Sequence, residues 1–541
     1  MVSKSVLFCF FAAFGGWVFG YDIGYISGCL IMPDFVKQFG QWNGTDAGTF
    51  FGALLQTLTS DSLGRKYSIM FWSVMAKIGV CSAGVNLMAR GVDLHWVGDL
   101  HLTRPPSLWA WRLLNLLPSV QTDSQFTVGT VIQLASFGLA QITVGRFVSG
   151  LGVGALSAIV PLYIGEAAPK KIRGSLLVLY QVQIISGLFL AYIIDLATHK
   201  IPNSASWRIP IGLQIIWGVL LILGAWALPE SPRLLLGKGK EEQALRSIAA
   251  LNDCTIDDPK AQEMLVELEE AVAVENAEGK GSWLELFSLK GHMWKRTLNG
   301  MMIQFLQQLN GQNFYYGPVF FQAAKIESLN SYTIQVIMGA VSFVMVMPAL
   351  WTIEHVGRRR SLITGAAFMF CCAIVAGLVG HFYTDSHNVP EDKRKLGGNI
   401  MIAFAILHVS AFSLFWGPAP WVILGETFPL RVRPKGIAIG SATNWFWNFM
   451  LGYFSPLIAD DIGPLILLIF AGVLLVAVFY VYFMIPETRR LTLEEVDEMY
   501  RSGTPAWRTN NWQPTVREHL PIDDKEMVHQ EHVRAAAVLT K

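Results

Sequence analysis

Long runs of uncharged, mostly apolar residues recur along much of the sequence. A membrane-spanning helix needs about 20 such residues, and the runs that reach this length lie at 126–145 (continuing past Arg146 to 165), 174–194, 209–229, 297–324, 328–353, 361–384, 396–425, 436–459 and 462–486. Only 15% of the 541 residues are charged, against roughly 25% in soluble domains. The chain is therefore predicted to be an all-α integral membrane protein.

A further run at 5–33 is interrupted only by Asp22. No small-residue cleavage site follows it, so we interpret it as a membrane helix and not as a cleavable signal peptide.

Basic clusters predict the topology. They fall in alternate loops, at Arg65-Lys66, Lys170-Lys171-Arg173, 233–296, Arg358-Arg359-Arg360, Arg431-Arg433-Lys435 and Arg489-Arg490. Because cytoplasmic loops are enriched in Lys and Arg, we expect these loops and both termini to be cytoplasmic, with Lys393-Arg394-Lys395 as an exception. Asn43 then lies in the first outside loop, in a glycosylation sequon, Asn43-Gly44-Thr45.

The two halves of the chain repeat one pattern. Gly64-Arg65-Lys66 corresponds to Gly357-Arg358-Arg359, the pair Glu166 and Arg173 to Glu426 and Arg433, and Pro229-Glu230 to Pro486-Glu487. Such internal repeats are typical of transporters built from a duplicated bundle. We predict a first half at 1–230, a cytoplasmic helical linker at 231–296, a second half at 297–486, and a cytoplasmic tail at 487–541 that begins as a helix, Thr492 to Tyr500.

Five motifs in order carry a family resemblance. They are Gly145-Arg146-Phe147 through Arg173-Gly174, Pro229 to Arg233, the Gln-Gln-x-x-Gly-x-Asn stretch from Gln307, Gly417 to Trp421, and Pro486-Glu487-Thr488. Over about residues 8–500 the chain resembles the sugar porter family of the major facilitator superfamily, and fungal hexose transporters in particular. The resemblance implies 12 transmembrane helices in two six-helix halves, a monomer in the plasma membrane, a sugar as substrate, and no cofactor.

Two stretches depart from the family pattern and perturb helices 2 and 3. The uncharged run Ala47 to Ser60 is too short for the second helix, because it spans about 21 Å at 1.5 Å per residue and the bilayer core is about 30 Å thick. Residues 76–125 interrupt the third helix with many charges. We interpret 76–125 as an insertion from a retained intron or similar gene-model error; a functional inserted domain is the alternative.

Five amides lie in one apolar run, at Gln307, Gln308, Asn310, Gln312 and Asn313. Amides in lipid must face other helices or an aqueous cavity, and sugar hydroxyls need groups that both donate and accept. Helix packing is the competing interpretation. The resemblance implies a substrate site made of Gln181, Gln307, Gln308, Asn313, Trp421 and Asn448.

Several members of this candidate site carry alternatives. Trp421 could instead face lipid, and Asn444 and Trp447 could each serve the site or only packing. The family pattern implies that Tyr315 and Tyr316 form an outer gate, but they follow Asn313 by two residues fewer than usual, which changes their register.

Charged residues suggest two further roles. Asp22 and Arg146 are the two charges that lie inside predicted spans, so we expect them to pair; in proton-coupled relatives an aspartate here carries the proton, yet facilitators share it, and we favour facilitated diffusion. Partly solvated ion pairs at the cytoplasmic helix ends would form a latch, each worth about 1 kcal/mol. Its expected members are Arg65, Glu166, Arg173, Glu230, Arg358, Glu426, Arg433 and Glu487.

The favoured function is hexose transport, with glucose as the expected substrate, by alternating access. A sugar sensor and a non-functional product of a defective gene model are the alternatives. We find no constellation typical of an enzyme or a metal site and expect no nucleic-acid partner; the partners are a sugar and the lipid bilayer, with protons left open.

Overall fold

The computed structural model describes residues 4–39, 124–168, 172–277, 281–312, 330–385, 389–489, 491 and 493–513. These residues form helices, turns and loops, with no β-strand among them. The predicted short second helix at 47–60 and most of the insertion at 76–125 lie outside the described residues, as do Asn43, Arg65, Asn313, Tyr315 and Tyr316 and the last residues of the tail.

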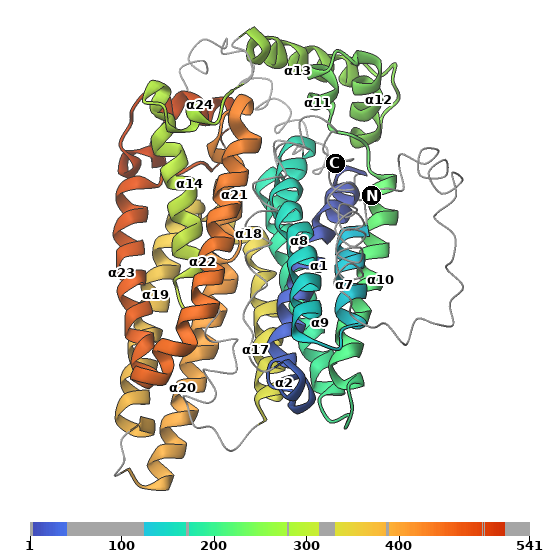
Figure 1. The fold of residues 1–541 in the computed structure, drawn as a ribbon. Helices are drawn as coiled ribbons and strands as arrows, with labels where there is room; N and C mark the ends of the chain where they lie inside the picture. Colours follow the sequence, from blue (N-terminus) through green and yellow to red (C-terminus); the bar gives the residue numbers. More distant parts are fainter. Residues whose placement is uncertain are drawn as a thin grey trace, which may run out of the picture.

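The first half is a bundle of long helices with one short helix at its edge (Figure 1). Its elements are α1 (Lys4–Cys29), α2 (Pro33–Phe39), α7 (Ser124–Leu134), α8 (Leu139–Ala167), α9 (Arg173–Thr198) and α10 (Ala205–Ala227). The long run predicted from 126 to 165 thus forms two helices, because the chain turns between Leu134 and Leu139, and α7 packs back against α8.

Short helices connect the halves and cover one end of the bundle, which we call the linker face (Figure 1). They are α11 (Pro232–Gly237), α12 (Glu241–Asn252), α13 (Pro259–Ala277), η2 (Leu284–Phe287) and η3 (Lys290–His292). Ser231 caps α11 by accepting a hydrogen bond from the Leu234 N–H, and Pro232 follows at the first helical position, where its missing N–H has no cost. Lys4 pairs with Asp253 at 2.6 Å, which places the start of α1 on the linker face.

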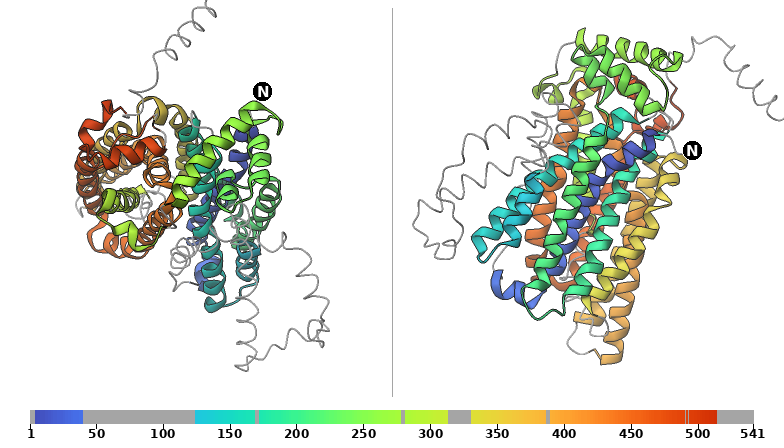
Figure 2. Two further views of the ribbon diagram at one scale, coloured as in Figure 1. Left: turned by 90° about the horizontal axis from the view of Figure 1, so that it is seen from above. Right: turned by 90° about the vertical axis from the view of Figure 1, so that its right-hand side faces the viewer.

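The second half forms a second bundle beside the first (Figure 2). Its elements are α14 (Met293–Gln308), α17 (Ser331–Val346), α18 (Ala349–His355), α19 (Arg358–Val379), η4 (Gly380–Asp385), α20 (Glu391–Ala411), η5 (Phe412–Trp416), α21 (Ala419–Thr427), η6 (Leu430–Val432), α22 (Arg433–Ile462), η7 (Gly463–Leu465) and α23 (Ile466–Met484). The tail continues on the linker face as α24 (Leu493–Arg501) and η8 (Ala506–Asn511), which confirms the predicted tail helix.

Seven helices of the described residues are long and apolar enough to cross a membrane, or eight if the bent pair α17 and α18 is one span. The protein is thus a multi-pass membrane protein. Three predicted boundaries differ. Helix α9 continues past residue 194 to Thr198, α20 begins at Glu391 and not at 396, and α14 ends at Gln308 inside the run 297–324. Gly311 follows that end with φ = 89°, a conformation that favours glycine.

Helix α1 packs on α9 more closely than side chains would allow. Glycines at 16, 20, 24 and 28 of α1 face α9, and a Cβ built on Gly20 would lie 1.8 Å from the carbonyl oxygen of Ile184. Small residues at four-residue spacing let membrane helices approach backbone to backbone. The two helices therefore form one tightly packed pair within the first half.

Candidate functional site

Gln307 lies at the end of α14 and joins three helices. Its Nε2 donates to the carbonyl oxygens of Trp416 (3.0 Å) and Gly417 (2.9 Å), and its Oε1 accepts from Nδ2 of Asn444 at 2.8 Å. The side chain is buried. An amide has two donors and two lone pairs, so one lone pair of Oε1 is what Gln307 has left for a ligand in this conformation.

The carbonyls that Gln307 satisfies stand at a helix break. Pro418 lies between the π-helical turn η5 and α21, Pro420 is the second residue of α21, and proline lacks the N–H that would continue the helical ladder. Because Pro420 is four residues beyond Trp416, the Trp416 carbonyl loses its usual α-helical donor. Gln307 replaces that donor, so the helix-packing interpretation of this amide is part of its role.

Gln308 and Asn448 form a second amide pair, between α14 and α22. Nδ2 of Asn448 donates to Oε1 of Gln308 at 3.0 Å, and both side chains are partly exposed. Partial exposure leaves these two amides better placed than Gln307 to exchange partners with a polar ligand.

Gln181 reaches from the first half to the second. Its Nε2 would lie 3.1 Å from a Cβ on Gly417, and it forms no hydrogen bond within the part of the chain that the structure describes. Gly417 accepts from Gln307 on the other side, so the backbone at Gly417 brings the predicted residues Gln181 and Gln307 together across the boundary between the halves.

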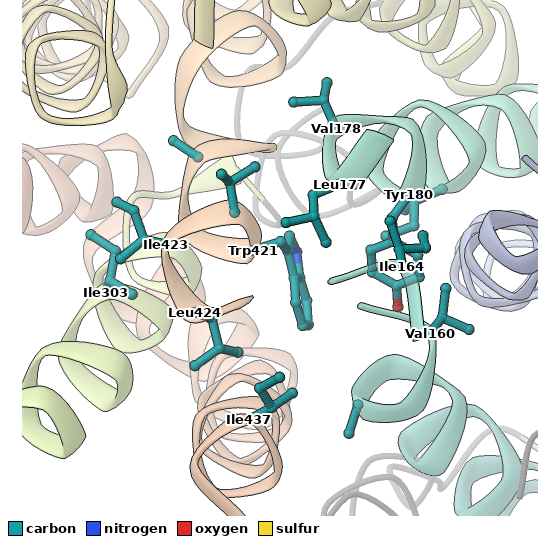
Figure 3. Packing of buried hydrophobic residues seen from close by; sticks show 14 of the residues in the cluster. Val160, Ile164, Leu177, Val178, Tyr180, Ile303, Trp421, Ile423, Leu424 and Ile437 are labelled. Atoms are coloured by element: carbon teal, nitrogen blue, oxygen red, sulfur yellow. The ribbon is translucent and has the colours of Figure 1, made fainter. Parts of the chain in front are cut away.

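Trp421 is buried between the halves and does not face lipid. Its ring meets Tyr180 of α9 edge-on, with ring centroids 5.5 Å apart and 80° between the planes, and it is 2% exposed. Figure 3 shows it projecting from α21 toward Leu177 and Tyr180. The lipid-facing alternative is therefore wrong.

Two neighbours on α22 complete this region. Asn444, whose role was left open, is buried and also donates to Oε1 of Gln304 at 2.7 Å. Trp445 was missed; its Nε1 donates across the halves to Oγ of Ser157 at 3.0 Å. A tryptophan beside an amide within an apolar run was the available signal. Asn313, Tyr315 and Tyr316 lie outside the described residues.

Asp22 and Arg146 form the expected ion pair within the first half. Nη1 of Arg146 lies 3.2 Å from Oδ1 of Asp22, and the two side chains are 2% and 5% exposed. The Tyr25 hydroxyl contacts both, at 3.3 Å from Asp22 Oδ1, and Arg146 donates to that hydroxyl. Gln214 also donates to Asp22, at 2.7 Å. The carboxylate is thus paired with a cation and surrounded by donors.

Gln214 and Gln133 were not singled out from the sequence. Gln133 of α7 lies 3.1 Å from the Tyr25 hydroxyl, and Thr130 donates to Gln214 at 3.0 Å. Both glutamines are amides inside apolar runs, which is the criterion that identified Gln307, so the same criterion would have found them.

Part of the expected latch forms a buried cluster on the linker face. Arg358 donates to Glu426 through Nη2 (2.8 Å) and Nε (3.3 Å), and their side chains are 3% and 8% exposed. The expectation of partly solvated pairs is wrong here. Glu487 accepts from the backbone N–H groups of Arg358 (3.0 Å) and Arg359 (3.2 Å) and so caps the start of α19.

The other predicted latch residues are spread over the same face. Glu166 accepts from Ser231 at 2.6 Å, Glu230 from the Ser231 N–H at 2.9 Å, and Arg433 donates to the Phe428 carbonyl at 2.9 Å. Arg173 is buried at the first turn of α9, and Arg65 lies outside the described residues.

Glu354 was missed and links the halves at the linker face. Its Oε1 accepts from the Ser175 N–H in the first turn of α9 at 3.1 Å, and its Oε2 pairs with Arg358 at 3.2 Å. The Ser175 hydroxyl donates to the Leu350 carbonyl at 3.1 Å. Glu354 precedes Gly357-Arg358-Arg359, and its position beside that basic motif was the available signal.

The halves also meet at the opposite end of the bundle, which we call the far face. The Tyr332 hydroxyl of α17 donates to the Gly28 carbonyl of α1 at 3.3 Å, and the Tyr332 ring stacks on His199 with centroids 4.3 Å apart. The described parts of the two halves thus contact each other at both faces. Within the described residues no cluster of His, Cys, Asp or Glu could hold a metal ion.

Comparison with known proteins gives consistent matches. The profile of the family described as "Sugar (and other) transporter" matches residues 8–96 and 120–500; the gap lies within the predicted insertion. A low-affinity glucose transporter of Kluyveromyces lactis is 37% identical over 530 residues, covering 97% of this chain and 87% of that protein. A galactose transporter of Saccharomyces cerevisiae is 35% identical over 533 residues, covering 98% and 87%.

Among solved structures, the proton:xylose symporter XylE bound to 6-bromo-6-deoxy-D-glucose superposes with a TM-score of 0.69 at 23% identity. The match covers 92% of this chain and 99% of XylE. The agreement shows a shared fold, that of the major facilitator superfamily.

Proposed function

The chain belongs to the sugar transporter family, and on that premise we propose that it carries a hexose, with glucose first among the candidates, by alternating access. It is a transporter and not an enzyme. The single observation that supports this proposal most is the meeting of Gln181 of the first half with Gln307 of the second at Gly417. A ligand held there contacts both halves, so its binding can be linked to their relative movement.

The chemistry of this region suits a sugar. Gln181, Gln308 and Asn448 offer amide groups that donate and accept, and Trp421 offers an aromatic surface for the apolar side of a sugar ring. In this proposal Gln307 contributes one acceptor and holds the helix break in place. Asn313 belongs to the same proposed site, and Tyr315 and Tyr316 to its proposed gate.

We propose that the linker face is cytoplasmic and that the latch residues hold it closed. Glu354 and Ser175 provide a direct link between the halves, and the buried cluster of Arg358, Glu426 and Glu487 positions Glu354. The plasma membrane is the proposed location, with both termini cytoplasmic and the protein acting as a monomer.

We favour facilitated diffusion over proton symport. Asp22 is paired with Arg146 and receives a further hydrogen bond from Gln214. All of these partners belong to the first half, so the pair ties helices of one bundle together, which supports a structural role for it.

Uptake of radiolabelled glucose in cells that lack their own hexose carriers tests the proposal. The assay compares the full chain with a chain that lacks 76–125, and competing hexoses rank specificity. Saturable uptake by either chain supports transport; sugar binding without uptake by correctly inserted protein would instead identify a sensor. A simultaneous record of external pH tests the mechanism, because sugar-induced alkalinisation that disappears in Asp22→Asn would identify proton symport.

A further inference from the structure

Asp195 is a buried acidic residue of the membrane region. It lies in the last turn of α9, near the far face. The predicted span 174–194 stops just before it, but α9 continues to Thr198 and Asp195 is 0% exposed. Its Oδ2 lies 2.1 Å from where a Cβ on Gly28 would be, so the carboxyl group fills the space that this glycine leaves on α1.

The Asp195 carboxyl group has no hydrogen-bond partner in the part of the chain that the structure describes. Neither oxygen accepts a hydrogen bond within the described residues, and no Lys, Arg or His there forms an ion pair with it. The titratable groups that face it are Tyr21 and Cys29 of α1 and Tyr332 of α17, and His199 follows one turn later on its own helix. None of the three from the other helices supplies a positive charge.

The ionised form of Asp195 would be strongly destabilised at this buried position. Burying an unpaired charge away from water is strongly unfavourable, and such groups neutralise instead. Asp22 differs, because Arg146 and Gln214 both donate to it. In this conformation Asp195 is therefore a neutral acid that carries a proton.

The cover over Asp195 is a contact between the halves. Tyr332 of the second half donates to the Gly28 carbonyl and stacks on His199, and Nδ2 of Asn330 lies 3.2 Å from Nε2 of His199. Gly28 and Asp195 both belong to the tightly packed pair α1 and α9. Movement of α17 away from α1 and α9 is thus what exposes this carboxyl group to water.

We propose that Asp195 is a proton-binding site that takes up a proton when the halves close at the far face and releases it to the same side when they part. The proposal rests on the alternating-access mechanism proposed above. Because the proton returns to the side from which it came, Asp195 makes transport sensitive to external pH without moving protons across the membrane.

The direction in which external pH shifts closure of the far face follows from the closed state, which requires Asp195 to be neutral. Closure of the far face is favoured at low external pH and weakens as pH rises above about 3.9, where a water-exposed aspartate ionises. The ratio of closed to open protein then falls by up to about tenfold per pH unit. A closing step that limits transport makes uptake fall as the external medium becomes alkaline.

His199 also belongs to this contact and needs a separate control. Its Nδ1 lies 2.7 Å from the Leu196 carbonyl and must donate, so Nε2 must accept from Asn330. The Asn330 amide cannot simply flip, because its Oδ1 accepts from the Tyr332 N–H. The variant His199→Gln therefore tests whether His199, and not Asp195, sets a pH dependence of this contact.

The first experiment measures initial rates of glucose uptake between external pH 4.5 and 8 for the wild type, Asp195→Asn, Asp195→Leu and His199→Gln, normalised to the amount of protein at the cell surface. We expect the alkaline fall in uptake to disappear in both Asp195 variants and to persist in His199→Gln. Two Asp195 variants are used because one of them could fail to insert. A wild-type alkaline fall that persists in the Asp195 variants would overturn the proposal, and so would a sugar-driven proton signal that depends on Asp195.

The second experiment needs no transport. Cys29 is fully buried beside Asp195, so a membrane-impermeant thiol reagent labels it when the far face opens, with Cys29→Ala as the background control. We expect labelling of the wild type relative to Asp195→Asn to rise with external pH. A ratio that does not change with pH refutes the proton site. A ratio that rises in a protein without uptake supports the site and refutes hexose transport.

Discussion

Replacement of Gln307 by leucine should destabilise the second half of the bundle and not only weaken sugar binding. The substitution keeps the approximate size of the side chain but removes the amide that donates to the Trp416 and Gly417 carbonyls. Pro420 stands where the α-helical donor to the Trp416 carbonyl would be, and Pro418 directly follows Gly417; neither has an N–H to replace the amide. The break between η5 and α21 then loses its support.

The magnitude follows from the number of orphaned groups. Each buried polar group without a partner costs about 1–3 kcal/mol, and two carbonyls give about 2–6 kcal/mol. Asn444 adds little, because it keeps its hydrogen bond to Gln304. If each half unfolds like a domain of 150–250 residues, for which 1 kcal/mol corresponds to about 2–4 °C, a central loss of about 4 kcal/mol lowers the apparent Tm by roughly 8–16 °C.

The assay is thermal unfolding of the purified protein in detergent, with Gln308→Leu as the matched control. Gln308 is the next residue, is partly exposed and bonds to Asn448, so its loss should change the apparent Tm little while it weakens sugar binding. The reasoning is refuted if Gln307→Leu unfolds at the wild-type temperature, or if Gln308→Leu loses as much stability as Gln307→Leu.

Three further changes have defined outcomes. Glu487→Gln removes the charge that caps α19 and should cost about 0.5–2 kcal/mol of stability; an unchanged thermal midpoint contradicts the capping role. Trp421→Leu loses an aromatic contact worth about 0.5–1.5 kcal/mol beyond burial and should raise the KM for glucose, whereas the wild-type KM would remove Trp421 from the site. A chain without 76–125 should reach the cell surface in larger amounts and take up more glucose than the full chain, and equal uptake by both argues for a functional inserted domain.

The membrane class, the helical fold and the burial of Gln307 could be predicted, because apolar runs and polar residues within them are local features of the sequence. The partners of Gln307 could not. Its donors meet carbonyls more than 100 residues away, at a break that depends on how two prolines place Trp416 and Gly417 in space. Periodicity contains no information about that meeting.

The charges show the same limit. Asp22 and Arg146 were predicted to pair because both lie within apolar runs, and they do. Asp195 was taken to end its span because the runs were defined by the absence of charge, so the definition itself hid a buried acid. Arg358 and Glu426 were expected to be partly solvated, since helix ends usually meet water; in the structure the pair is buried, with Gly174 of the first half lying against Arg358.

The contact between α1 and α9 limits which parts of the protein can move during transport. With the Ile184 carbonyl against Gly20 and the Asp195 carboxyl group against Gly28, neither helix can rotate or slide past the other without a collision of backbone atoms. The pair therefore moves as one rigid unit, which we call the beam, along the length of the first half. Opening at either end must therefore come from α17 and its neighbours tilting away from this beam, so a cross-link between α1 and α9 should leave the transport cycle intact, whereas a cross-link between α9 and α17 should stop it.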